Sequence, residues 1–92
     1  MAALKTLIES TLKERSEPDR TYWFERGQQS DASPQREETP ASTSEAMYWA
    51  DEEADLLVGL LDQLGKAPCR IALGALREGV KSRLYRAYLA RR

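Results

Sequence analysis

Residues 45–64, EAMYWADEEADLLVGLLDQL, are the stretch that decides the fold. On a helix at 100° per residue, the apolar side chains of this stretch cover an arc of about 200°. A helix that packs against a single neighbour needs an apolar stripe of only about 100°. We therefore predict one helix between two neighbours, the central helix of a small bundle. Its apolar residues are Met47, Trp49, Ala50, Ala54, Leu56, Leu57, Val58, Leu60, Leu61 and Leu64.

A second helix is predicted to follow after a very short turn. The pattern Ser42-Thr-Ser-Glu45 is a capping box at the start of the central helix, and Gly65 is a typical cap for its C-terminal end. Pro68 suits the first turn of the next helix, which extends to about Ala90. The core stripe of this last helix consists of Cys69, Leu73, Leu76, Val80, Leu84 and Ala87. Two helices with so short a link form either an antiparallel hairpin or a helix-turn-helix.

The chain before this hairpin divides into two parts. Residues 1–27 contain an amphipathic helix at about 2–16, predicted to pack on the hairpin, and then an aromatic segment. Residues 28–43, QQSDASPQREETPAST, hold no Val, Leu, Ile, Met or aromatic residue. Nothing there can offset by burial the ~1–2 kcal/mol of backbone entropy that each ordered residue loses. We predict a flexible polar linker at 28–43 and an all-α fold, a three- to four-helix bundle built on the antiparallel hairpin 44–92.

Composition limits the function classes. Ninety-two residues make one small domain, and the single cysteine excludes an internal disulfide, which favours a reducing, cytoplasmic setting. The chain has no histidine. A zinc site would therefore lack its commonest nitrogen ligand, and acid–base catalysis at neutral pH would lack its usual base. We see no secretion signal, and the uncharged runs are shorter than the ~20 residues that cross a bilayer. We expect no enzyme, cofactor, metal or membrane anchor.

Charge is divided between the two predicted helices. Residues 45–62 hold six acids and no base, whereas residues 66–92 hold eight bases and one acid. Helical spacing gathers some of these bases into a stripe interleaved with tyrosine, a pattern that suits an acidic protein surface or a phosphate backbone. Its residues are Arg70, Arg77, Lys81 and Tyr88, with Tyr85 and Arg92 at its edge. The alternative is a solvated face that the acidic helix partly neutralises.

Two further groups are candidates. Tyr22, Trp23 and Phe24 form an aromatic run, which predicts either a recognition patch or a hydrophobic plug over the end of the bundle. Glu53 lies inside the apolar arc of the acidic helix, and Arg83 intrudes similarly on the core stripe of the basic one. A half-buried carboxylate needs a partner, so we predict a structural ion pair between Glu53 and Arg83. The alternative is that Glu53 receives a cation from outside.

Residues 60–79, LLDQLGKAPCRIALGALREG, resemble the helix-turn-helix of DNA-binding regulators. The turn glycine matches at Gly65, the apolar residue before it at Leu64, and the buried residue of the second helix at Ile71. Lys66 and Gly74 stand where the motif usually has apolar residues. The resemblance implies a DNA-binding transcriptional regulator, acting through residues 56–79 as a dimer, with its second helix in the major groove.

We expect non-enzymatic binding of another macromolecule, by an adaptor, inhibitor or regulator whose protein partner has an acidic surface. In this hypothesis the aromatic run supplies affinity and the basic stripe steers association. Nucleic-acid binding through the helix-turn-helix is the alternative. The wide apolar arc is also compatible with a homodimer.

Overall fold

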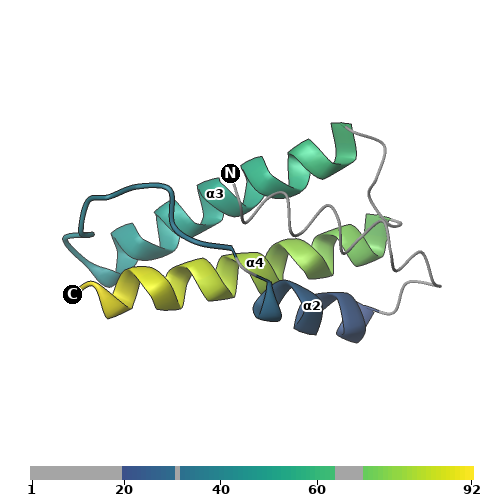
Figure 1. The fold of residues 1–92 in the computed structure, drawn as a ribbon, viewed down its shortest axis with the longest axis horizontal. Helices are drawn as coiled ribbons and strands as arrows, with labels where there is room; N and C mark the ends of the chain where they lie inside the picture. The colour runs from purple at the N-terminus through teal and green to yellow at the C-terminus, as the bar shows by residue number, and fades with distance from the viewer. Residues whose placement is uncertain (1–19, 31, 64–69) are drawn as a thin grey trace.

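The computed structural model describes residues 20–30, 32–63 and 70–92, a part of the chain that holds three α-helices and no strand (Figure 1). They are α2 (Arg20–Gln29), α3 (Thr43–Gln63) and α4 (Arg70–Ala90). α3 and α4 run antiparallel to each other (Figure 1). The predicted all-α fold with its antiparallel hairpin is thereby confirmed. The predicted helix 2–16 and the turn 64–69 lie outside the described residues.

α3 begins as its capping pattern predicts. The backbone N–H of Glu45 donates to Ser42 Oγ at 3.1 Å, and the N–H of Ala46 donates to the Ser42 carbonyl at 3.0 Å. These contacts satisfy N–H groups that have no partner within the helix. The helix then continues without a break through Gly59 to Gln63. The prediction of one uninterrupted helix is confirmed over this range.

Among the described helices, α4 and not α3 is central. α4 packs against both α2 and α3, whereas Leu56 on α3 is 73% exposed and Leu60 is only partly buried. Our prediction that α3 lies between two neighbours is therefore wrong within this part of the chain. The width of the apolar arc on α3 indicates how much of its surface could be buried. Of the described helices, α4 packs against one side of this arc only. The main core includes Trp23, Leu57, Val58, Leu61, Leu76, Val80 and Leu84.

α2 approaches α4 closely because each helix has a glycine at the contact. A Cβ atom added to Gly27 would lie 2.6 Å from the Leu76 carbonyl oxygen, and one added to Gly79 would lie 2.9 Å from Gly27 Cα. Any larger residue at either position would push the two backbones apart. This contact brings the Trp23 side chain, 1% exposed, into the main core. The aromatic segment thus lies within a helix.

The irregular segment 32–42 joins α2 to α3 and contacts both long helices. Ala32 is buried in the main core, and Arg36 Nη2 lies 2.8 Å from Glu52 Oε1 on α3. From α4, Arg91 donates to the backbone carbonyl of Arg36. The expectation that no side chain is buried here is therefore wrong, although flexibility of the segment stays a prediction.

Candidate functional site

α3 neutralises much of the predicted basic stripe. Arg77 Nη2 and Nε each lie 2.5 Å from a carboxylate oxygen, of Asp51 and Asp55 respectively, and Lys81 Nζ lies 3.2 Å from Asp51. The hydrogen bonds from Arg77 and then Lys81 lower the pKa of the Asp51 carboxyl. Those to Asp55 and Asp51 raise the pKa of Arg77. Arg77 and Lys81 therefore join α3 to α4, as in the alternative that we gave for the stripe. The side chain of Arg70 is not among those described.

Tyr88 is fully buried, which removes it from the predicted binding stripe. Its hydroxyl donates to the Glu53 carboxylate, which also accepts the backbone N–H of Gln35 at 3.3 Å. The rings of Tyr88 and Trp49 meet edge to face, with centroids 5.3 Å apart. Burial, followed by the bond to Glu53, raises the pKa of the Tyr88 hydroxyl. The predicted Glu53–Arg83 ion pair is wrong, because Tyr88 and Gln35 supply the hydrogen bonds to this buried carboxylate.

The aromatic run serves mainly as a plug. Trp23 lies in the main core and Phe24 packs against it. Tyr22 alone of the three is exposed, at 37%, and its ring meets that of Trp23 edge to face at 5.3 Å. Tyr85, from the predicted stripe, is half-buried between the main core and the cluster around Trp49. A recognition patch of three aromatic side chains is therefore not present on this surface.

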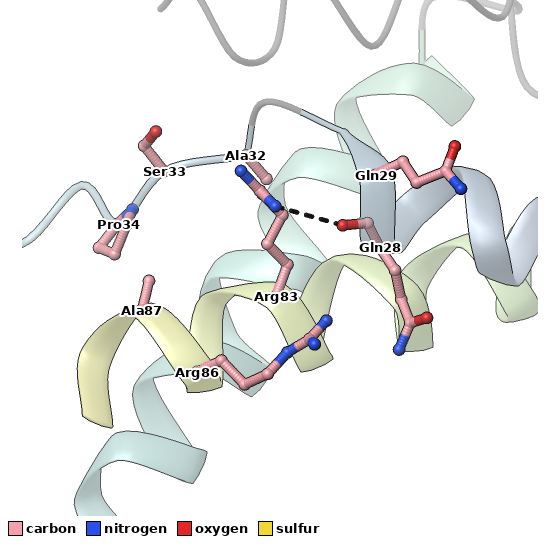
Figure 2. Close-up of a pocket in the computed structure, with 8 residues that line it drawn as sticks. All are labelled: Gln28, Gln29, Ala32, Ser33, Pro34, Arg83, Arg86 and Ala87. Carbon is pink, nitrogen blue, oxygen red and sulfur yellow. Dashed lines mark hydrogen bonds between the residues drawn. The ribbon is translucent and has the colours of Figure 1, made fainter. Parts of the chain in front are cut away.

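A polar cleft lies where the end of α2 and the segment after it meet the C-terminal half of α4 (Figure 2). We call it the arginine cleft; its volume is about 610 Å³. Arg83 and Arg86 extend into it from α4, and Arg83 Nη1 donates to the Gln28 carbonyl at 3.4 Å (Figure 2). Its lining consists of Gln28, Gln29, Ala32, Ser33, Pro34, Arg83, Arg86 and Ala87.

The helical repeat explains how the two arginines share this cleft. Residues 83, 86 and 87 are three and four positions apart, so they lie on one face of α4. Gln28 holds the adjoining end of α2, since its side-chain Nε2 donates to Ser82 Oγ at 3.3 Å. Arg83 also meets a carbonyl in the last turn of α2, where a cation is favourable. α2 therefore forms one wall of the cleft and α4 supplies its charges.

Among the described residues, the lining of the arginine cleft holds two positive charges and no acid. Among the described residues, Arg86 has no ion-pair partner, and the only hydrogen bond of the Arg83 guanidinium is to a carbonyl. Guanidinium groups bind carboxylates and phosphates with two parallel hydrogen bonds. The cleft is therefore suited to an anionic ligand. The described residues contain no group of three His, Cys, Asp or Glu side chains arranged to hold a metal ion.

Sequence reasoning assigned Arg83 to an ion pair and did not select Arg86. The useful signal was the arrangement of acids on the opposite helix. The acids of α3 that pair with Arg77 and Lys81 face one side of α4, whereas α2 and its glutamines face the side that bears Arg83 and Arg86. Whether a base on α4 has an acidic partner among the described residues thus depends on whether α3 or α2 packs against its side of the helix.

No family model, no curated protein and no solved structure matches this chain. In the described part of the chain, none of the helices has the length and apolar character that crossing a bilayer requires.

Proposed function

We propose that this protein binds an acidic segment of a partner protein in the arginine cleft, acting without catalysis as an adaptor, inhibitor or regulator. The observation that carries the proposal is the pair of guanidinium groups in a cleft whose described lining residues include no acid. A cytoplasmic setting is part of the proposal, since the one cysteine cannot form an internal disulfide.

The lining favours a peptide over a nucleic acid. Ala32, Pro34 and Ala87 add apolar surface beside the two arginines, which suits a segment that alternates carboxylates with small apolar side chains. A nucleic acid needs a broad basic surface for many phosphate contacts. Here the net charge is −1, and α3 carries six acids and no base. Arg77 is occupied by Asp51 and Asp55, and no described contact favours the helix-turn-helix alternative.

The proposal is tested by selecting binders from a library of random 12-residue peptides displayed on phage, with the full chain immobilised. We expect the selected peptides to be enriched in Asp and Glu. The double charge reversal Arg83→Glu, Arg86→Glu should abolish this enrichment. It should also weaken the best peptide at least about tenfold, because two charge-assisted contacts become repulsive. Arg92→Glu is the matched control, since Arg92 is exposed outside the cleft, and it should change affinity less than about twofold.

Three outcomes contradict the proposal. The first is no peptide enrichment, or enrichment without acidic residues. The second is unchanged peptide binding by the double reversal, with its helical circular dichroism intact. The third is tighter binding of a duplex DNA than of the best peptide, with a steep dependence on salt, which indicates phosphate contacts. Light scattering after size exclusion, run on the same samples, also tests the predicted homodimer.

A further inference from the structure

A second cleft lies on α3, and we call it the leucine groove. It has a volume of about 670 Å³ and is lined by the C-terminal half of α3 together with Gln35 and Arg36. Its apolar lining includes Leu56, Leu57 and Leu60, and Leu56 is the most exposed large hydrophobic side chain of the described residues, at 73%. Of the described residues, none lines both this groove and the arginine cleft.

The spacing of the lining residues gives the groove the shape of a helix–helix contact. Positions 52, 56, 60 and 63 follow one another at intervals of three and four along one face of α3. Eleven intervals at 1.5 Å per residue extend about 16 Å, which is three turns of a helix. Gly59, in the same row, contributes no side chain, and a Cβ added there would meet nothing within 4 Å. A side chain from a second helix can enter such a gap between ridges.

The charges around the groove select the kind of helix. The acids Glu52, Glu53 and Asp55 line it; Glu52 and Asp55 are 40% and 64% exposed, although Asp55 also pairs with Arg77. Arg36 is the one base among the described lining residues. Its guanidinium already pairs with Glu52 and lies over the Trp49 ring, 4.8 Å from the ring centroid. The C-terminal end of α3, with its partial negative charge, adds to the same field. The groove is thus apolar at its centre and negative around it.

We propose that the leucine groove binds an amphipathic helix of a partner protein that carries leucine-like residues at three- and four-residue spacing, flanked by lysine or arginine. Such a helix buries Leu56 and Leu60 against its apolar face and places its cations beside Glu52 and Asp55. A second copy of the same face fits poorly. A two-fold contact would bring two base-free acidic helices together, and like charges in an interface disfavour association.

The test uses the full chain and synthetic 18-residue peptides followed by fluorescence anisotropy. The probe peptide has leucines at three- and four-residue spacing with lysines on its flanks; one control peptide has glutamate in place of lysine, and another has the probe's composition in scrambled order. We expect the probe to bind at least about tenfold more tightly than either control. Leu56→Ser should weaken the probe at least about tenfold, because the contact then no longer buries a leucine side chain.

Tyr48→Ser is the matched protein control, since Tyr48 is exposed on the same helix but does not line the groove; it should change affinity less than about twofold. Arg83→Glu, Arg86→Glu should also retain the probe, so failure of the arginine cleft and of the leucine groove can be told apart. Equal binding of probe and control peptides overturns the proposal, as does unchanged binding by Leu56→Ser. Absence of probe binding also overturns the proposal. In that case a dimer that Leu56→Ser dissociates would show that a second copy covers Leu56. A monomer would show that the chain itself covers it.

Discussion

Replacing Gly79 with alanine is expected to destabilise the protein, although alanine is the better helix former. The added Cβ would lie 2.9 Å from Gly27 Cα and 3.0 Å from the backbone nitrogen of Gln28. Both atoms belong to the backbone of α2, so neither can turn aside as the end of a side chain can. Gly74, on the same helix, is the matched control, because a Cβ added there meets no atom within 4 Å.

The expected magnitude follows from two opposing effects. Alanine in place of glycine inside a helix stabilises by ~0.5–1 kcal/mol, whereas one extra carbon in a tight contact destabilises by ~1–3 kcal/mol. Gly79→Ala should therefore lose about 1 kcal/mol in the free energy of unfolding, while Gly74→Ala should gain ~0.5–1 kcal/mol. Complete separation of α2 would expose Trp23, with a loss of up to ~4–6 kcal/mol. We therefore expect α2 to shift and remain in contact with α4.

Urea unfolding followed by circular dichroism measures both variants. The two midpoints should move in opposite directions at an unchanged slope, with the free energies of unfolding about 2 kcal/mol apart. In thermal unfolding of a domain of this size, 1 kcal/mol corresponds to ~4–8 °C. Equal stability of the two variants, or greater stability of Gly79→Ala, would refute the close contact between the backbones of α2 and α4.

Two predictions concern pH. The pKa of Asp51 is lower in the folded than in the unfolded chain, so its contribution to stability is present above about pH 4 and is lost as pH falls further. Asp51→Asn should reduce the free energy of unfolding at pH 7 by less than about 1 kcal/mol, since the pair is partly exposed. In urea titrations this deficit should shrink as the pH falls below about 4, and a deficit that stays constant contradicts the prediction. The pKa of Tyr88 is raised, so above about pH 10 the unfolded chain releases this proton first and stability falls. Tyr88→Phe should remove that part of the alkaline loss but reduce stability by ~1–3 kcal/mol at pH 7, because Glu53 loses a hydrogen bond; equal alkaline slopes for both proteins argue against a buried Tyr88.

The sequence by itself determined the local structure of the hairpin. The cap at Ser42 and the uninterrupted helix through Gly59 follow from interactions within a few residues, which a sequence displays directly. The core stripe of the last helix is recovered at Leu76, Val80 and Leu84, because helical periodicity needs no knowledge of the neighbour. The alternative of an acidic helix that neutralises the basic one was also readable, since the two charge blocks are separated along the chain.

Only the tertiary structure decided which groups meet. The Glu53 carboxylate is hydrogen-bonded to Tyr88 rather than paired with Arg83. A pair of glycines brings α2 onto α4, which makes α4 the central one of the described helices. The same packing pairs Arg77 with the acids of α3 and leaves Arg83 and Arg86 in a cleft that has no acid among its described lining residues. Each of these outcomes depends on contacts between segments 20 or more residues apart. A side chain's sequence neighbours fix the face of the helix on which it lies, but the distance to its partner is fixed by how the helices pack.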